Sequence, residues 1–587
     1  MAAEEPGRPV AASAQDHDTG TFARNSMSVV AWTTVSRLSG FVRIAVVAAV
    51  LGPTYLGNVF QATNSLPMIA YAALTGSLFS NLLVPPLVGH VDRGDRKAAA
   101  RLAGGFLTAA LAVFGVVCAL IALGSPLILR LLSLGVPDDA AASQRRAGLI
   151  LLLLFIPQML MYAVVGTAEA VMNAHGRFAL PAAAPALENA GIIATMAATA
   201  VIYGTGDALA APTTGLMLLL GAGTTSAVAL HAAVQWCGAR SVGVTLLPQR
   251  AWRVPEVRAI LRRAVPSLGY STLDVVQPFG AMIVANRVPG GVIAFQLAVN
   301  LYTLPSALGT RPVAVALLPR LARLSGSGQL RRFRDELVRA AALVAFLTVP
   351  AAVAYLILRD PLARAVTFGQ MAAPPGRALV AVSIAALTPG LIGYAALLLG
   401  THACYARRDA RSPFHAALLR AAVAAAGMVV AFQVPAGPAA LLALGLTFSA
   451  ADIAGGARLV ARLRRVLPVG GERLGGPLAR TLTAATLMSA PAYLVADRLP
   501  ALLPGSFSAQ VSMVAATAVG AAVYFLLQWW WRSPELTLIR SGLVPGGSRP
   551  PGAPATGPPG TPATGPPGAP ATGPPGTSRP APTSRPT

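Results

Sequence analysis

Long apolar segments recur along most of this chain, and they constrain its fold more than any other feature of the sequence. A helix of about 20 apolar residues is long enough to cross a hydrocarbon core of about 30 Å. Of the 587 residues, 55% are hydrophobic and 11% are charged, whereas about a quarter of the residues in a typical soluble protein are charged. The sequence therefore predicts an all-α polytopic membrane protein.

We predict about fourteen transmembrane helices, which should alternate in direction across the membrane. Their expected ranges are 27–51, 58–88, 98–123, 147–172, 179–203, 212–236, 259–285, 292–318, 336–358, 377–400, 412–433, 438–461, 478–497 and 507–530.

The basic residues predict the orientation of these helices. The net charge of +24 would suggest nucleic-acid binding in a soluble protein. Here Arg residues gather in every second link between apolar segments, as in "DRGDRKAAAR" and "YARRDAR". Cytoplasmic links of membrane proteins carry such an excess of Lys and Arg. We therefore expect no nucleic-acid partner, and we expect the even-numbered links and both termini to be cytoplasmic.

A weak internal repeat predicts the domain organisation. "SLPMIAYAALTGSLFSNLLVPPL" in the second segment is echoed by "TLPSALGTRPVAVALLPRL" in the eighth. "NAHGRFALP" after the fourth is echoed by "CYARRDARSPF" after the tenth. Both echoes are offset by six helices, which predicts two six-helix lobes in parallel repeat plus two extra helices. Parallel repeats are a transporter architecture, with the substrate site between the halves.

The expected parts are a disordered cytoplasmic N-terminus, two lobes, a basic linker between them, a final helix pair and a disordered Pro/Gly-rich cytoplasmic tail. In that chain order their ranges are 1–26, 27–236 for the N-lobe, 237–258 for the linker, 259–461 for the C-lobe, 462–530 for the pair and 531–587 for the tail.

The sequence shows no sign of an enzyme. Metal or proton chemistry in a membrane enzyme needs clustered carboxylates or histidines. The six histidines are scattered, and His231, Glu169, Glu188 and Asp452 lie singly within or near apolar segments. There is no GxxxxGK[ST] phosphate loop, so the chain itself should not be an ATPase. We expect no metal and no cofactor, with transport driven by the membrane potential or an ion gradient.

Two arginines interrupt the first apolar segment, in "TTVSRLSGFVR". A charge near the bilayer centre costs roughly 2.5–3.5 kcal/mol on insertion scales, and such residues usually face a wet cavity or a partner. The planar guanidinium suits a phosphate-bearing ligand. Arg37 and Arg43 should lie about 120° apart around an ideal helix, so both can border one wide cavity. Alternatively, each arginine pairs with a carboxylate or with carbonyls as a structural clamp, and Arg43 can extend outward to the interface.

Several motifs in order resemble the MurJ/MviN family of lipid II flippases, which belongs to the multidrug/oligosaccharidyl-lipid/polysaccharide exporter superfamily. The motifs are "SRLSGFVR", "LP…FSNLLVP", "NAHGRFALPAAAPALENAGIIA", "LP…ALLPRLARL" and "CYARRDARSPF", and the likeness covers roughly residues 24–530. The resemblance implies a central cationic cavity and two extra helices that border a groove for a lipid tail. It also implies alternating access in the bacterial plasma membrane, which moves the undecaprenyl-pyrophosphate-linked peptidoglycan precursor to the outer leaflet.

The chain matches the charged residues of this family only in part. Arg37 and Arg43 match two cavity arginines, but the arginines of the second and eighth helices are replaced by Tyr71 and Asn300. A family Asp falls at Asn58 and a family Glu at Gly76.

Arg311 is a possible replacement for a missing family cation. It follows Asn300 by about three helical turns and would share its face on an ideal helix. The alternative is that Arg311 binds carbonyls freed by Pro312. The predicted substrate-binding residues are Arg37, Arg43, Arg311, Asn300, Tyr71 and Asn58.

The predicted function is the flipping of a polyprenyl-pyrophosphate-linked glycan, with lipid II as the leading substrate. Membrane lipids and proteins of cell-wall synthesis or division are the other expected partners. One alternative is an exporter of the same superfamily for another lipid-linked glycan or for a drug, and a cationic drug would favour acidic cavity residues. The other alternative is a transport-dead scaffold for cell-wall enzymes, which the changes at Tyr71 and Asn300 leave open.

Overall fold

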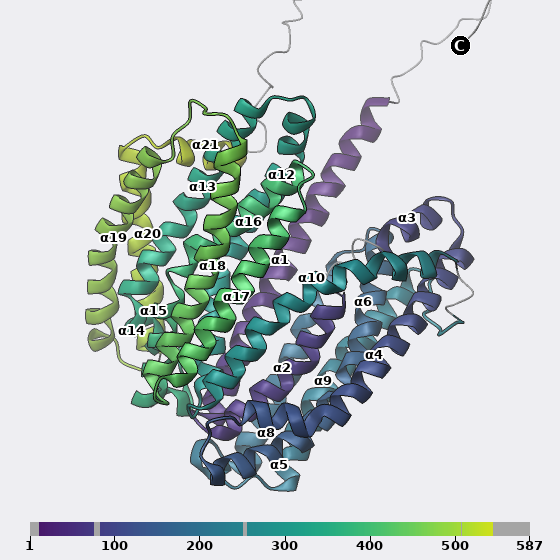
Figure 1. Ribbon diagram of the computed structural model, residues 1–587, viewed down its shortest axis with the longest axis vertical. Coiled ribbons are helices and arrows are strands. Elements are labelled where there is room, and N and C mark those ends of the chain that lie inside the picture. Colours follow the sequence, from purple (N-terminus) through teal and green to yellow (C-terminus); the bar gives the residue numbers. More distant parts are fainter. Residues whose placement is uncertain (1–10, 76–82, 251–254, 506, 544–587) are drawn as a thin grey trace, which may run out of the picture. The chain divides into compact units, whose positions relative to one another are not determined.

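The computed structural model describes residues 11–75, 83–250, 255–505 and 507–543. Their regular elements are helices (Figure 1). The bounds are α1 Ala11–Leu51, α2 Tyr55–Thr75, α3 Val84–Asp92, α4 Arg96–Leu132, α5 Asp138–Phe155, α6 Gln158–Ala174, α7 Ala179–Ala183, α8 Pro185–Tyr203, η2 Gly206–Leu209, α9 Thr214–Ser241, α10 Pro255–Asn286, α11 Gly291–Pro305, η4 Ser306–Thr310, α12 Arg311–Gly326, α13 Leu330–Ile357, α14 Arg359–Val366, η5 Gly369–Ala372, α15 Pro374–Leu387, α16 Gly390–Ala406, α17 Arg411–Gln433, α18 Pro438–Val466, α19 Gly475–Leu502, α20 Ser508–Trp530 and α21 Pro534–Leu543.

These helices confirm the predicted all-α membrane fold. Within the described residues, ten helical segments are long and apolar enough to cross a membrane, or eleven if the bent pair α15 and α16 counts as one span. The described parts of the other predicted ranges also fall on helices: 58–75 and 84–88 of the second range on α2 and α3, 259–285 on α10 and 478–497 on α19.

Side-chain caps determine where several helices begin. The Asp95 carboxylate accepts a hydrogen bond from the Ala98 N–H before α4, and the Thr213 hydroxyl accepts one from Leu216 before α9. Asp409, just before α17, accepts bonds from the Ser412 hydroxyl at 2.7 Å and from the Ser412 N–H at 3.0 Å. Both bonds lower the pKa of Asp409, and the bond from the Ser412 hydroxyl has the larger effect. Each cap satisfies an N–H that has no partner inside its helix.

The two halves repeat each other closely in chain order. Helices α6 and α16 are both 17 residues long, and each follows a proline, Pro157 or Pro389. Proline removes a helical N–H and disfavours helix at the residue before it, so it separates α5 from α6 and α15 from α16. Both helices also end near a left-handed residue, Gly176 with φ 70° and Arg408 with φ 58°. The predicted parallel repeat is therefore present in the structure.

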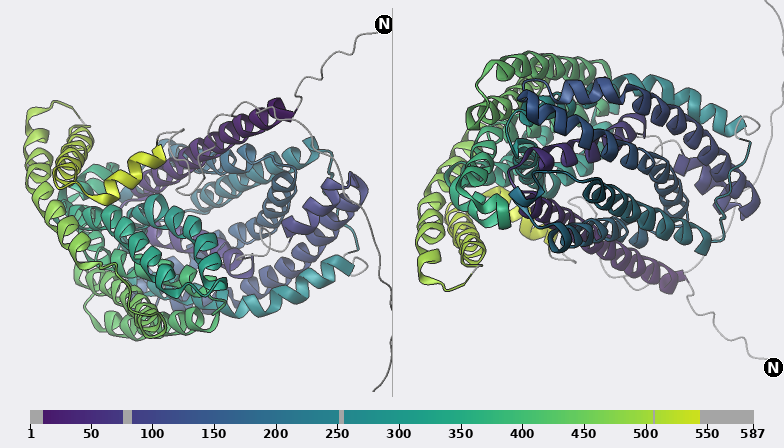
Figure 2. Two further views of the ribbon diagram at one scale, coloured as in Figure 1. Left: turned by 90° about the horizontal axis from the view of Figure 1, so that it is seen from above. Right: turned by 90° about the horizontal axis from the view of Figure 1, so that it is seen from below.

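Helices α1–α9 form the first half and α10–α18 the second, and α10 packs against both. It contacts α2 and α4 of the first half and α17 and α18 of the second. Helix α1 packs on α7 and α8 and also contacts α11. The extra helices α19 and α20 pack along each other and against α13 and α14, at the edge of the second half (Figure 2).

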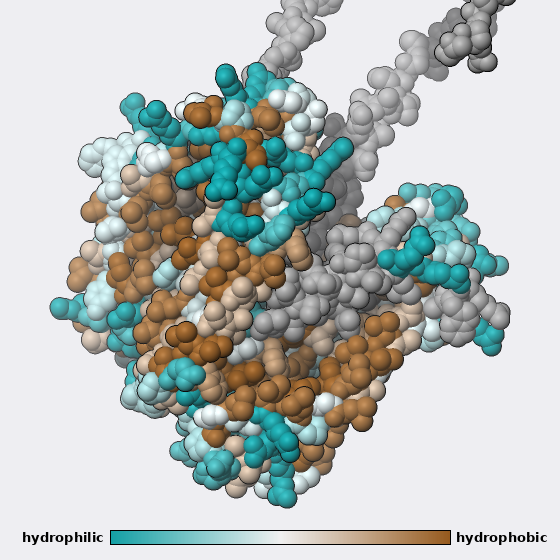
Figure 3. Space-filling view, viewed as in Figure 1, coloured by the Kyte–Doolittle hydropathy of each residue, from teal (hydrophilic) through white to brown (hydrophobic). Residues whose placement is uncertain are grey.

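The outward faces of these helices are apolar. Figure 3 shows brown surfaces along the helices, with hydrophilic residues gathered toward the ends. Large exposed side chains include Leu120, Leu123 and Leu127 on α4 and Val429 and Val430 on α17. An apolar exterior of this extent suits contact with lipid.

Hydrogen bonds join the two halves at one end of the helices. The Asn58 amide, which is fully buried, donates to Val288 O at 2.7 Å and accepts from Val292 N at 3.0 Å. The Gly290 N–H donates to Thr54 O, and the Gln370 amide donates to Thr205 Oγ1. These residues lie in or beside odd-numbered links, so this is the end predicted to face outward. We call it the closed end.

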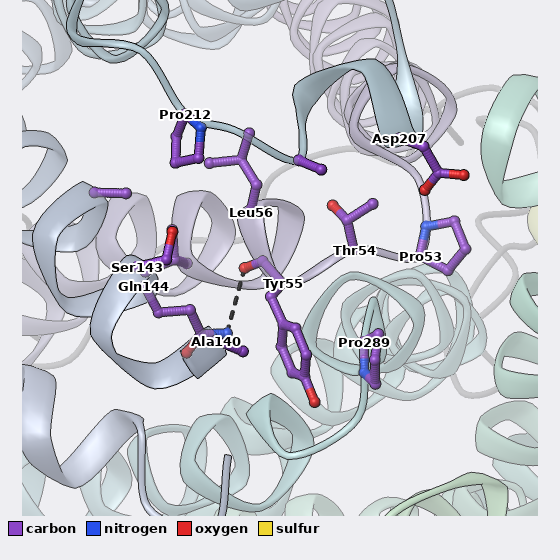
Figure 4. Close-up of a pocket in the computed structure, with 13 residues that line it drawn as sticks. Pro53, Thr54, Tyr55, Leu56, Ala140, Ser143, Gln144, Asp207, Pro212 and Pro289 are labelled. Atoms are coloured by element: carbon purple, nitrogen blue, oxygen red, sulfur yellow. Dashed lines mark hydrogen bonds between the residues drawn. The ribbon is translucent and has the colours of Figure 1, made fainter. Parts of the chain in front are cut away.

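A cavity of about 280 Å³ lies at the closed end (Figure 4). Its walls come from the α1–α2 link, from α5, from the η2 segment and from Pro289. There the Gln144 amide donates to Tyr55 O, so polar contacts also line the inside of this end.

The structure differs from the expected ranges at both termini. Helix α1 begins at Ala11, so part of the N-terminal segment expected to be disordered is helical. Helix α21 occupies Pro534–Leu543 within the range expected to be a disordered tail. Pro at the first position and Glu535 in the first turn favour this helix start. Gly76 and the repeats of the tail from residue 544 onward lie outside the described residues.

Candidate functional site in the membrane-spanning helices

Arg37 is an exposed cation on a membrane-spanning helix. Its guanidinium has no ion-pair partner among the residues that the structure describes. Small residues on either side of it pack α1 on α8: the Asn189 amide donates to Ser39 Oγ at 2.9 Å and to Ser36 O at 3.3 Å. This contact holds the α1 backbone while leaving the Arg37 side chain outside the packed interface.

Arg43 follows in the same helix and faces a buried polar cluster of the first half. Its Nη1 lies 4.0 Å from Glu188 Oε1. The Tyr162 hydroxyl donates to the same oxygen at 3.0 Å, and His231 Nδ1 lies 2.8 Å from Glu188 Oε2. The Glu188 side chain is 10% exposed and that of His231 5%. Four helices, α1, α6, α8 and α9, therefore meet at one carboxylate.

The cluster continues along α9 and α6. The Gln235 amide nitrogen lies 3.4 Å from His231 Nε2 and 3.4 Å from Glu169 Oε1. Gln235 is fully buried, and its Oε1 has no hydrogen-bond partner in the described part of the chain. One acceptor in this network is thus left unused.

Tyr71 adjoins the same cluster. Its ring stacks on Phe114 at 5.7 Å between centroids and lies 5.4 Å from the ring of Tyr162. The structure thus brings Tyr71 and Arg43 to the same cluster, Tyr71 at the Tyr162 ring and Arg43 at the Glu188 oxygen that Tyr162 also contacts. Their role in substrate binding remains a prediction.

A second buried cluster lies in the second half. The Asp452 carboxylate is 1% exposed; it accepts from Arg420 Nε at 2.6 Å and from the Tyr302 hydroxyl at 2.6 Å. Tyr302 lies 6.2 Å from Tyr394, ring centroid to centroid. The Tyr394 hydroxyl in turn accepts a hydrogen bond from Arg311 at 3.2 Å.

The predicted alignment of Arg311 with Asn300 assumed an ideal helix, and the helix between them is not ideal. Helix α11 ends at Pro305, and a π-helical turn over Ser306–Thr310 follows. The Asn300 amide donates to Gln296 O of its own helix. Arg311 is exposed and reaches Tyr394 instead of carbonyls near Pro312.

Asn58 lies apart from the other predicted site residues, because its amide is used at the closed end. Its partners come from residues 228 to 234 positions away in the chain. This geometry supports a role in joining the halves, and the predicted contact of Asn58 with substrate is untested.

An apolar groove of about 420 Å³ runs between α13 and α20, with residues of α11, α14 and α19 completing its wall. Two tyrosines in it bond to main-chain carbonyls: Tyr355 donates to Leu301 O and Tyr524 to Phe346 O. Because their hydroxyls are used in this way, the lining exposes mainly hydrocarbon.

Sequence reasoning treated Glu188, His231 and Asp452 as isolated residues, and the structure shows that all three are paired. The available signal was their position in apolar segments, because an ionisable residue in a membrane helix usually has a partner or a function. The internal repeat offered a further signal, because residues of the two clusters stand at matching positions in the two halves. Tyr162 and Tyr394 are separated by the same number of residues as Glu188 and Arg420.

Comparison with known proteins shows which family the chain is similar to. A family model described as "Lipid II flippase MurJ" matches residues 47–512. The chain is 24% identical over 523 residues to a probable lipid II flippase MurJ of Rhizobium meliloti, which covers 87% of this chain and 94% of that protein. It is 25% identical over 400 residues to one of Rhizobium tropici, covering 68% of this chain and 73% of the relative.

Solved structures share the fold. A lipid II flippase MurJ in an inward closed conformation aligns with a TM-score of 0.64 at 17% identity, over 87% of this chain and 99% of that one. An inward-facing multidrug resistance MATE family transporter of the MOP superfamily aligns with a TM-score of 0.55 at 15% identity, over 75% of this chain and 99% of that one.

Proposed function

We propose a specific transport reaction for this chain, which belongs to the MurJ family of lipid II flippases. It is a multi-span transporter and not an enzyme. We propose that it moves a polyprenyl-pyrophosphate-linked glycan, lipid II first among such lipids, from the inner to the outer leaflet of the bacterial plasma membrane by alternating access.

The observation that carries the proposal is the placement of the cations on the membrane-spanning helices. Arg37 and Arg311 are exposed, and neither has a carboxylate within ion-pair distance among the described residues. The buried carboxylates Glu188 and Asp452 are instead bound by other groups. Exposed guanidinium groups suit a pyrophosphate, which they can bind bidentately. A cationic drug would need the opposite charge.

The apolar groove supports a lipid-linked cargo. A prenyl chain must remain in a hydrocarbon environment while its polar head group crosses, because each buried CH₂ contributes about 0.8 kcal/mol. The groove between α13 and α20 offers such a surface on the second half. We propose that it holds the first part of the prenyl chain while arginines hold the head group.

The closed end supports the direction of access. Contacts such as that of Asn58 with Val288 join the halves at the odd-numbered links. With those links outside and both termini in the cytoplasm, this conformation would be closed to the outside. We propose that the membrane potential or an ion gradient drives the return between states.

Complementation tests this proposal. The chain is expressed in a bacterial strain depleted of its own lipid II flippase, and growth is measured together with the outward appearance of lipid II. We expect both to be restored. An Arg331→Ala variant, changed at an exposed position in the first turn of α13 and before the predicted span 336–358, should behave like the unaltered chain. Failure of rescue at normal membrane abundance would contradict the proposal. Rescue of growth without outward lipid II would favour the scaffold alternative.

A further inference from the structure

We propose that His231 and Glu188 form a proton-binding site that controls whether Arg43 is available to an anionic head group. The inference rests on the proposed function, because it names the ion that acts on the same arginine. His231, Glu188 and Arg43 meet in the first half, where His231 and Arg43 approach different oxygens of one carboxylate.

Charge balance within the cluster links the proton to Arg43. When His231 is neutral, Arg43 is the cation that compensates the Glu188 carboxylate, so withdrawing Arg43 would leave a buried charge unpaired. That loss is strongly unfavourable. When His231 carries a second proton, the imidazolium at 2.8 Å compensates the carboxylate by itself. Arg43, whose side chain is 21% exposed and whose contact is 4.0 Å long, can then turn to an external anion.

The contacts of His231 are compatible with a neutral ring. Its Nδ1 lies 2.8 Å from Glu188 Oε2, where an N–H can donate to the carboxylate. Its Nε2 lies 3.4 Å from the Gln235 amide nitrogen, which can donate to the lone pair of a neutral ring. With His231 in that form, Arg43 is the cation beside Glu188, at 4.0 Å.

The network also contains an acceptor for the second proton. Gln235 Oε1 is buried and has no hydrogen-bond partner among the described residues. Rotation of the amide by 180° would bring Oε1 to the position that its nitrogen now holds, where it can accept from a protonated Nε2. An acceptor for a protonated Nε2 can therefore be provided without moving a helix, and the rotated amide then no longer donates to Glu169 Oε1.

The second half lacks this property, although it repeats the arrangement. There the cation at the carboxylate is Arg420, bound to Asp452 at 2.6 Å, and arginine does not lose its proton in proteins. Histidine is the side chain whose ordinary pKa allows a change of charge between pH 5 and 8. Of the two buried clusters described, only that of the first half therefore contains a histidine that can respond to a proton.

The other groups around His231 favour the same coupling. Glu169 of α6 contacts the Gln235 amide, and its carboxylate, when ionised, favours a protonated His231 ring. Arg43 of α1 disfavours protonation of His231, because both side chains would then be cations near one carboxylate. Departure of Arg43 to a ligand therefore makes protonation easier, which is the reciprocal of protonation releasing Arg43. Tyr162 of α6 donates a hydrogen bond to Glu188, Tyr71 of α2 packs against the Tyr162 ring, and Arg37 of α1 makes no ion pair with the cluster among the described residues.

The test measures binding of farnesyl pyrophosphate by the purified full chain in lipid nanodiscs between pH 5.5 and 8.5. We expect the affinity of the unaltered chain to fall by about fivefold or more as the pH rises, a typical size for coupling between sites. His231→Gln keeps a hydrogen bond to Glu188 but cannot become cationic, so its affinity should stay at the low, high-pH level. Glu188→Gln no longer holds Arg43, so its affinity should stay at the high, low-pH level.

Two further variants act as controls. His402→Gln removes a half-buried histidine that bonds only to Leu398 O of its own helix in the described structure, and it should retain the profile of the unaltered chain. Glu169→Gln should also retain a pH dependence if His231 is the titrating group. Titration of the pyrophosphate itself is common to all variants, so each profile is compared with that of His231→Gln.

The outcomes separate this inference from the proposed function. Absence of binding by the unaltered chain at every pH would contradict the proposed anion-binding function. A pH dependence of binding that is as large in His231→Gln as in the unaltered chain, or that falls in Glu169→Gln to that of His231→Gln, would overturn the proton site and leave the proposed function standing. If His231→Gln does not fold, Glu188→Gln decides: a pH dependence retained there overturns the inference.

Discussion

Glu188 of α8 and Arg420 of α17 occupy the same position in the two six-helix repeats and carry opposite charges. Each is paired with the next helix of its half, Glu188 with His231 at 2.8 Å and Arg420 with Asp452 at 2.6 Å. The halves are thus alike in backbone but reversed in polarity at this point. In each half, this contact ties neighbouring helices together, and of the two pairs only that of the first half contains a histidine.

The Asp452 pair should stabilise the second half. Asp452→Leu removes the acceptor of both Arg420 and the Tyr302 hydroxyl, and breaking a buried pair in this way costs about 3–5 kcal/mol. We expect lower membrane abundance and a lower unfolding temperature in detergent. The exposed pair Arg359–Asp360 offers a matched control, because Asp360→Leu should cost no more than about 1 kcal/mol. Equal effects of the two variants would contradict this view of the buried pair.

Arg37 should be required for transport but not for folding. It is exposed and makes no ion pair in the described part of the structure, so Arg37→Ala should accumulate normally in the membrane while outward lipid II is lost. Arg37→Lys should fall between, because lysine keeps the charge and loses the bidentate contact. Both membrane abundance and outward precursor are measured. Low abundance with normal transport per molecule would show that Arg37 is a structural clamp.

The topology can be tested with single cysteines in a Cys-free background. Gly206 is a poor site, since it has φ 59° and an added Cβ would lie 2.7 Å from the Gln370 side chain. Ala208 is exposed, and Gly326 has open space for a Cβ. With an impermeant thiol reagent on intact cells, Ala208→Cys should be labelled and Gly326→Cys should not. The reverse pattern would invert the whole orientation.

The closed end should depend on Asn58. Asn58→Asp keeps the acceptor for Val292 N but places a carboxylate oxygen against Val288 O, where the amide now donates. A buried carbonyl without its donor costs about 1–3 kcal/mol. We expect a lower unfolding temperature of the purified protein. An unchanged unfolding temperature would mean that these bonds do not hold the halves together.

Residues 545–587 should be dispensable for transport. Their Pro/Gly/Ala/Thr composition offers no bulky apolar side chains for a core, and such segments do not gain enough from burial to fold. A chain that ends after Val544 should match the full chain in membrane abundance and in complementation. Loss of complementation at normal abundance would point to a partner that binds the tail.

The sequence by itself determined the membrane class, the positions of the helices and the repeat. In lipid every backbone N–H and C=O must be satisfied within the segment, so a spanning segment must be a helix of predictable length. Prolines and caps then mark its breaks, as Pro157 and Asp95 do. These signals are local and can be read along the chain.

Only the tertiary structure decided which polar groups meet. Glu188 contacts His231 from 43 residues away, and Asn58 contacts Val288 from 230 residues away. Such pairs depend on the rotation of each helix about its axis and on its neighbours, which a one-dimensional pattern does not record. For the same reason the sequence did not indicate that packing of the two halves brings the Asn58 amide to the closed end, and its predicted contact with substrate stays a prediction.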